Sequence, residues 1–91
     1  MRARDEKYFE IIGKNVRHFR ISKKLSQQAL AILCDKIDRS KISDIENAKE
    51  DFMLSTLLEI CEGLEISLND VIIDYGENFY LKTQANTENP S

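Results

Sequence analysis

The sequence is poor in the residues that build catalytic and metal sites. Among 91 residues it has one histidine, two cysteines, three glycines and one proline. The single histidine belongs to no motif that pairs it with a nucleophile, and no glycine-rich stretch has the pattern of a phosphate-binding loop. One histidine and two distant cysteines do not make a zinc site. We therefore expect no enzyme activity, no bound metal and no cofactor.

Long hydrophobic runs are also missing. No apolar run approaches the ~20 residues needed to cross a bilayer. The first ten residues, MRARDEKYFE, have no apolar stretch behind their basic residues, so a secretory signal is not expected. Cys34 and Cys61 each lie in an apolar helical pattern, which favours reduced core thiols over a disulfide. These features indicate a cytoplasmic protein without a membrane segment.

The net charge of −3 argues at first against a nucleic-acid partner. The charge is unevenly distributed, however. Residues 1–49 contain twelve Lys/Arg and seven Asp/Glu, whereas residues 50–91 contain one and nine. This asymmetry permits one basic surface that binds phosphates and a second, acidic surface elsewhere on the protein. The alternative is an uneven solvated surface with no charged partner.

The stretch from Leu25 to Asn47 predicts two short helices joined by a tight turn. Ser26 and Asp38 can each accept hydrogen bonds from the unpaired amides of a first helical turn. Each cap has apolar neighbours at the spacing of a hydrophobic staple. These apolar pairs are Leu25 with Leu30 and Ile37 with Ile42. Two capped helices this close together match a helix-turn-helix, whose second helix can enter a DNA major groove.

Helical spacing predicts five helices and no strand before residue 75. The expected ranges are about 5–22, 27–34, 39–47, 54–63 and 67–73. In the second helix the side chains expected to be buried are Leu30, Ala31, Leu33 and Cys34. Ser67 and Asp70 have the spacing of a capping box at the start of the fifth helix.

The third helix has an inward and an outward face. At 100° per residue, Ile42 and Ile45 share the inward face. The residues on the outward face and its flanks are Ser40, Lys41, Ser43, Asp44 and Asn47. Glu46 lies only about 40° from Ile42, so its carboxylate needs a partner, and Arg20 is the candidate. We expect Asn47 to adopt the left-handed conformation that ends the helix.

The pattern changes after residue 74. A disordered tail would not be expected to contain as many large apolar side chains as this segment does. They are Tyr75, Phe79, Tyr80 and Leu81. They predict a short strand or an arm that packs on the bundle or on a second subunit. Residues 83–91 are polar, and we expect disorder there. The chain is thus divided into a helix-turn-helix domain (1–74), a dimerisation arm (75–82) and a tail (83–91).

The sequence resembles the lambda-repressor-like, Cro-type helix-turn-helix regulators, often called the XRE family. The segments that carry the resemblance are IGKNVRHFR (12–20), LSQQALA (25–31), IDRSKISDIEN (37–47), LSTLLEICEGL (54–64) and ISLNDVI (66–72). They agree in order over roughly residues 9–73. The resemblance implies an all-α, compact five-helix domain. It also implies sequence-specific binding of operator DNA, usually as a homodimer on a palindrome.

The resemblance also implies roles for individual residues. Gln27 resembles the glutamine of the family's second helix, which contacts phosphate and supports the recognition helix. Residues at base-reading positions are Arg39, Ser40 and Asp44. Residues where base-edge or backbone contacts are usual are Lys41, Ser43 and Asn47. Arg20 and Glu46 match the family's internal ion pair. For Arg39 a phosphate contact or a free surface arginine stays open, and Asp44 can also serve only to exclude wrong sequences.

Two departures from the family pattern affect the recognition helix. Asp35-Lys36 stands where the family often has a single glycine, so the turn before this helix is one residue longer. The longer turn could tilt the helix and change which side chains reach bases. Ala48 replaces the glycine that is common after the third helix.

Two functional hypotheses follow. In the first, the chain is a dimeric transcriptional regulator that binds double-stranded DNA, with recognition helices about 34 Å apart in successive major grooves. The residues expected to form the dimer surface are Ile72, Ile73, Tyr75, Phe79, Tyr80 and Leu81. In the second, the chain is an antitoxin-like or other protein-interaction module, whose acidic C-terminal half binds a basic partner. The two hypotheses do not exclude each other.

Overall fold

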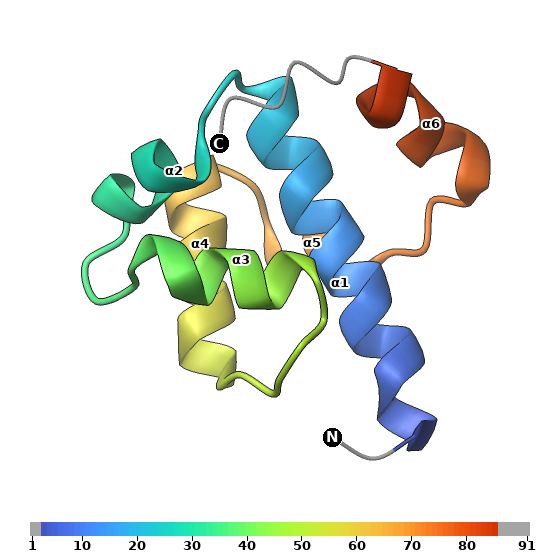
Figure 1. Cartoon of the computed structure of the whole chain (residues 1–91), viewed down its shortest axis with the longest axis horizontal. Coiled ribbons are helices and arrows are strands. Elements are labelled where there is room, and N and C mark those ends of the chain that lie inside the picture. Colours follow the sequence, from blue (N-terminus) through green and yellow to red (C-terminus); the bar gives the residue numbers. More distant parts are fainter. Residues whose placement is uncertain (1–2, 86–91) are drawn as a thin grey trace.

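The structure is a computed structural model that describes residues 3–85, and this part of the chain forms six helices (Figure 1). The helices are α1 (Ala3–Ser22), α2 (Gln27–Leu33), α3 (Arg39–Glu46), α4 (Leu54–Leu64), α5 (Leu68–Ile72) and α6 (Glu77–Ala85). Residues 3–85 contain no strand. The all-α fold class is therefore confirmed, with six helices in place of the expected five. Within the described range, none of the helices has the length and hydropathy needed to span a membrane.

Side-chain caps define where three of the short helices begin. Ser26, Asp38 and Ser67 each accept the backbone N–H three residues further on, at 2.9, 2.9 and 3.1 Å. The Asp70 carboxylate in turn accepts the N–H of Ser67 at 3.0 Å, which completes the predicted capping box. The cap at Asp38 makes Arg39 the first residue of α3.

Three helix ends are followed by a residue other than glycine in the left-handed conformation. These residues are Lys24, Ala48 and Glu65, with φ of 59°, 53° and 58°. After α3, Lys49 N–H bonds to Asp44 C=O at 2.9 Å, which is the Schellman arrangement. The expectation that Asn47 adopts the left-handed conformation is wrong, since its φ is −97°. The Schellman bond places the reversal at the residue before Lys49, and that residue is Ala48.

The core lies where α1, α2, α3, α4 and α5 meet. Its buried side chains are Val16, Leu30, Ala31, Cys34, Ile42, Ile45, Leu57, Ile60, Cys61, Leu64 and Val71. Both cysteines are buried and unpaired, as predicted. Burial, assisted by the Glu59 carboxylate, raises the pKa of the Cys34 thiol to about 11. Leu33, which was expected to be buried, is 56 % exposed, because α2 turns Ala31 and Cys34 inward instead.

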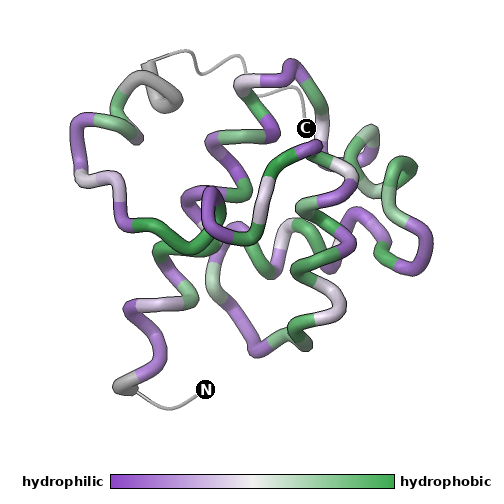
Figure 2. Tube along the Cα trace, turned by 180° about the vertical axis from the view of Figure 1, so that it is seen from behind, coloured by the Kyte–Doolittle hydropathy of each residue, from purple (hydrophilic) through white to green (hydrophobic). Residues whose placement is uncertain are grey.

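The segment after residue 74 forms helix α6 and not the strand that was one expectation; α6 packs on α1, as expected for an arm that packs on the bundle. The completely buried Asn15 of α1 connects the two. Its Nδ2 donates to the carbonyls of Val71 (2.7 Å) and Ile73 (2.8 Å), and its Oδ1 accepts the Tyr80 hydroxyl at 2.6 Å. Figure 2 shows that the link from α5 to α6 begins with a hydrophobic stretch on the side opposite the view of Figure 1. Asn15 thus joins the end of α5 and α6 to α1.

Aromatic rings complete the contact between α6 and α1. Phe79 stacks on Tyr75 with 4.2 Å between ring centroids, and its centroid lies 3.9 Å from that of His18. Burial lowers the pKa of His18 from its usual value. Residues 83–85, expected to belong to a polar tail, complete α6. The predicted disorder of residues 86–91 lies outside the described residues.

Gly13 lets the backbones of α1 and α3 approach each other closely. A Cβ at this position would lie 2.5 Å from the Ile45 carbonyl oxygen and 2.8 Å from that of Glu46. A glycine inside a helix ordinarily destabilises the helix by about 1 kcal/mol relative to alanine. Here its small size sets the spacing between α1 and the C-terminal end of α3.

We expect Gly13→Ala to lower the free energy of unfolding by about 1–2 kcal/mol. Overpacking against rigid backbone carbonyls costs about 1–3 kcal/mol, which outweighs the gain in helix propensity. The measurement is urea unfolding followed by far-ultraviolet circular dichroism. Gly63→Ala is the matched control, because its nearest contacts would be side-chain atoms of Leu30, Cys34 and Leu33, at 3.3, 3.4 and 3.6 Å, and not backbone carbonyls. Equal stability of the Gly13→Ala variant and the unaltered protein would contradict the close approach.

Candidate nucleic-acid interface

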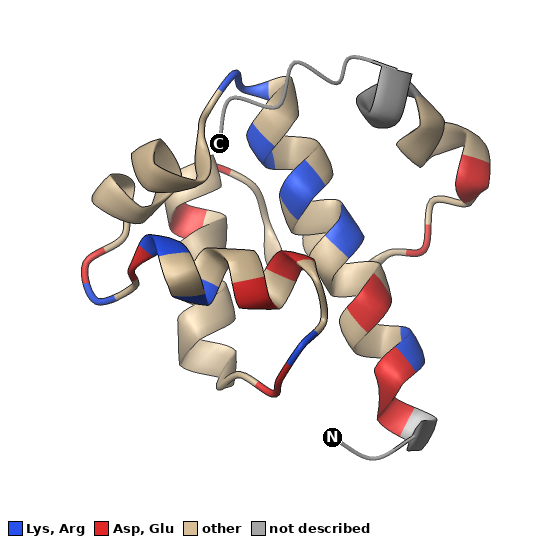
Figure 3. Ribbon diagram, viewed as in Figure 1, with Lys and Arg blue, Asp and Glu red and all other residues tan. Residues whose placement is uncertain are grey.

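Basic residues are concentrated in the first half of the chain. In Figure 3, the Lys and Arg residues of α1 lie mostly in its C-terminal half. Of these, Arg20 is buried and paired with Glu46, and Lys14 lies over the Tyr80 ring of α6. Residues 50–81, which include α4, α5 and the start of α6, contain no Lys or Arg. The asymmetry in the sequence is therefore an asymmetry between the helices that precede residue 50 and those that follow it.

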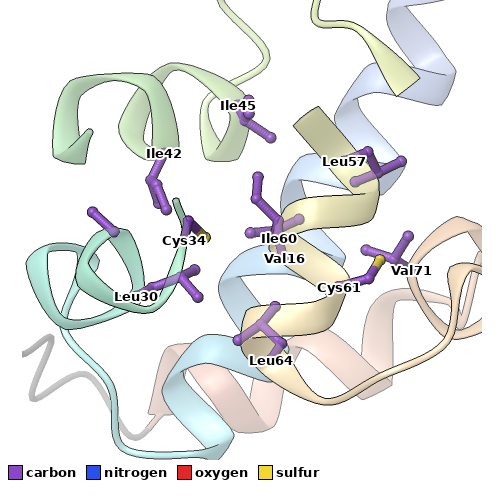
Figure 4. Close-up of a cluster of buried hydrophobic side chains, with 11 residues drawn as sticks. Val16, Leu30, Cys34, Ile42, Ile45, Leu57, Ile60, Cys61, Leu64 and Val71 are labelled. Atoms are coloured by element: carbon purple, nitrogen blue, oxygen red, sulfur yellow. The ribbon is translucent and has the colours of Figure 1, made fainter. Parts of the chain in front are cut away.

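Two isoleucines orient α3. Ile42 and Ile45 are fully buried, and Figure 4 shows both pointing into the cluster toward Ile60 and Val16. Burying two such side chains stabilises this orientation by several kcal/mol, at about 1.5–3 kcal/mol for each. The opposite side of α3 therefore faces outward. The exposed residues on it and at its ends are Arg39, Ser40 and Asn47, and the half-buried ones are Lys41, Ser43 and Asp44.

A buried ion pair fixes the C-terminal end of α3. Arg20 of α1 is completely buried; its Nε donates to Glu46 Oε2 at 2.6 Å and its Nη2 to Glu46 Oε1 at 3.0 Å. Its Nη1 donates to the Leu25 carbonyl at 2.8 Å. Gln27 Nε2, at the start of α2, donates to Glu46 Oε1 at 3.2 Å. One carboxylate of α3 thus binds both α1 and α2. The pairing expected from the helical wheel is present.

Gln27 lies largely inside the fold. The residue is 8 % exposed and its side chain contacts Glu46, so it supports α3 directly. Its Nε2 carries two hydrogens, and the bond to Glu46 uses one of them.

The residues that flank the outward face of α3 have partners within the chain. Lys41 Nζ lies 2.9 Å from Glu50 Oε1 and donates to the Asp51 carbonyl at 3.4 Å. Asn47 Nδ2 donates to the carbonyl and the hydroxyl of Ser43, at 2.9 and 3.4 Å. Both interactions are solvent-exposed and are therefore weak enough to exchange for other partners.

An open hollow of about 620 Å³ lies beside the start of α3. It is lined by Asp35, Lys36, Ile37, Asp38, Ser40, Lys41, Asp44 and Thr56. Ser40 and Asp44 therefore lie both on the outward face of α3 and beside the turn between α2 and α3, residues 34–38. The structure brings together the predicted residues of α3, with Gln27 behind them.

Two residues that position these elements were not found from the sequence. Asn15 was missed because an asparagine inside an amphipathic helix has no distinctive pattern. Glu59 of α4 was missed because it is one of several acidic residues; its Oε1 accepts the N–H of Lys36 in the extended turn at 2.6 Å. Neither contact could be inferred without knowing how the helices pack.

The geometry defines a helix-turn-helix domain: two short capped helices, with the second held against the core by one face and exposed on the other. The comparison with protein families agrees, since the model described as helix-turn-helix matches residues 16–71, more than half of the chain. The chain belongs to this family of DNA-binding regulators, of the Cro and lambda-repressor type. No curated protein and no solved structure matches the chain significantly.

We expect Glu46→Ala to lower the free energy of unfolding by about 3–5 kcal/mol, because it leaves the buried Arg20 guanidinium without its carboxylate. Chemical denaturation measures the change. Glu50→Ala is the matched control: it breaks the Lys41–Glu50 pair, whose side chains are 30 % and 52 % exposed, and should cost about 0–1 kcal/mol. The double variant Arg20→Met/Glu46→Leu should recover much of the loss. Similar losses for Glu46→Ala and Glu50→Ala would show that the buried pair has no special role.

Proposed function

We propose that this chain is a sequence-specific DNA-binding transcriptional regulator that inserts α3 into the major groove. The observation that carries the proposal is the fixed orientation of α3. Ile42 and Ile45 hold one face in the core and Glu46 is bonded to α1 and α2, while Arg39 and Ser40 remain exposed. A helix held this firmly can present the same polar edge to every DNA site, which base readout requires.

Each predicted contact residue has a role in this proposal. Arg39 is suited to bind guanine O6 and N7, and Asp44 can accept from a cytosine amino group. Ser40 can contact either base edges or phosphate. Lys41 and Asn47 exchange their exposed intramolecular bonds for contacts with the DNA backbone or with base edges, and Ser43 joins them. The second hydrogen of Gln27 Nε2 donates to phosphate at the N-terminus of α2.

The proposed active form is a homodimer on a palindromic operator in the cytoplasm. Ile72 and Ile73 are 47 % and 45 % exposed, and Leu81 is 48 % exposed. These exposed side chains form the proposed contact with a second copy. Tyr75, Phe79 and Tyr80 support it from beneath, because they contact residues of their own chain and Tyr80 is only 7 % exposed.

A second candidate function is an antitoxin-like or other protein-interaction module. The absence of Lys and Arg from residues 50–81 favours it, because this acidic half is suited to a basic protein partner. Both functions can belong to one protein, since the two surfaces differ.

DNA titrations at several salt concentrations distinguish the two candidates. Duplexes selected from a random pool should bind at least about 10³-fold more tightly than unselected duplexes, and affinity should fall steeply with salt. Arg39→Ala should lower this ratio by about tenfold or more through the loss of one base contact. Lys7→Ala, which removes the same charge beside the link to α6, should leave the ratio unchanged. Weak binding that is indifferent to sequence would instead favour the interaction module.

The oligomeric state tests the proposed dimer surface. Light scattering of the full chain should give the mass of a dimer, and Ile72→Asp combined with Ile73→Asp should give that of a monomer. The two introduced aspartates would be buried without partners in the dimer interface, which disfavours association. Ile32→Asp is the control, because Ile32 on α2 is 73 % exposed and lies outside the proposed surface. A monomeric unaltered protein, or a dimer that survives the double substitution, would contradict the proposal.

A further inference from the structure

Glu59 of α4 is hydrogen-bonded to the turn between α2 and α3, residues 34–38. The Glu59 carboxylate accepts the backbone N–H of Lys36 at 2.6 Å. The Glu59 carbonyl is also 3.9 Å from Cys34 Sγ, at the end of α2, in a weak S–H···O contact. The Glu59 side chain therefore contacts the turn, and its backbone carbonyl contacts the end of α2. A hydrogen bond to an ionised carboxylate is stronger than a bond between neutral groups.

The two ends of α3 are held by different means. The C-terminal end contacts Gly13 of α1 and forms the buried pair with Arg20. The N-terminal end carries Arg39 and Ser40, follows directly from the turn, and lies at the far end of the helix from α1 (Figure 1). α3 has eight residues and is about 12 Å long. Pivoting it by about 10° around its C-terminal end would move Arg39 by about 2 Å, more than a base contact tolerates.

We propose that Glu59 is a positioning residue that sets the tilt of α3 and thereby the DNA sequence that the protein prefers. The five residues between α2 and α3, 34–38, are not helical and have several conformations available, and the bond from Glu59 to the Lys36 N–H selects one of them. Glu59 itself does not contact DNA in this proposal; it acts through the turn on Arg39 and Ser40. The inference rests on the proposed DNA-binding function.

Three variants of the full chain separate this role from general effects of charge. Glu59→Ala removes the acceptor. Glu59→Gln removes the charge but keeps an oxygen that can accept the Lys36 N–H. Glu62→Ala is the control, because it removes a carboxylate from an exposed position of the same helix. Urea unfolding first determines the stability of each variant. All DNA measurements are then made under conditions in which each variant is fully folded.

The first measurement needs no DNA. Amide hydrogen exchange, followed by nuclear magnetic resonance, should be about tenfold or more faster at Lys36 in Glu59→Ala than in the unaltered protein. Glu59→Gln should restore most of the protection, and Glu62→Ala should leave it unchanged. Unchanged protection of Lys36 in Glu59→Ala would overturn the proposal.

The second measurement is the ratio of affinities for duplexes selected by the unaltered protein and for random duplexes. We expect this ratio to fall about tenfold in Glu59→Ala, the effect of losing roughly one base contact, while affinity for random duplexes is kept. Glu59→Gln should recover most of the ratio. A simple loss of stability would instead lower both affinities together. If the unaltered protein prefers selected duplexes and Glu59→Ala keeps that affinity ratio, this inference alone is overturned. If the unaltered protein binds selected and random duplexes equally, the proposed function is overturned as well.

Discussion

The arrangement of this domain depends on satisfying one buried guanidinium. Arg20 is completely inaccessible to water, so its charge must be compensated within the fold, and Glu46 of α3 provides the compensation. The same carboxylate accepts from Gln27 of α2. The first three helices are therefore mutually fixed: a packing that moved α3 away from α1 or α2 would leave a buried charge without a partner. This constraint makes the outward edge of α3 a rigid surface.

Rigidity is not uniform along α3. Its C-terminal end has the buried pair and the close contact at Gly13, both shielded from solvent. Its N-terminal half is held by the buried Ile42 and by Ile37, which packs on the core, and beyond these by the Asp38 cap and the exposed bond from Glu59 to the turn. Exposed interactions contribute less to stability than buried ones. The end that carries Arg39 is thus the end whose position can be changed with the least loss of stability, which makes it a natural place for specificity to vary.

The back of the fold depends on a second buried polar residue. Asn15 uses both amide hydrogens and its oxygen to bind the end of α5 and the Tyr80 hydroxyl of α6. α1 therefore stands between two polar connections, one to α3 and one to α5 and α6. The proposed DNA-binding face and the proposed dimer face are supported by different sides of the same helix.

Local interactions were readable from the sequence, because they join residues only a few positions apart. The caps at Ser26, Asp38 and Ser67, the inward face of α3 and the need of Glu46 for a partner all follow from helical spacing. Tertiary packing decided the rest. The contact from Asn15 to Tyr80 joins residues 65 positions apart and that from Lys36 to Glu59 joins residues 23 apart, so neither leaves a periodic trace in the sequence. Packing also turned Leu33 outward and drew residues 77–85 into a helix, because burial depends on which surface a neighbouring helix covers.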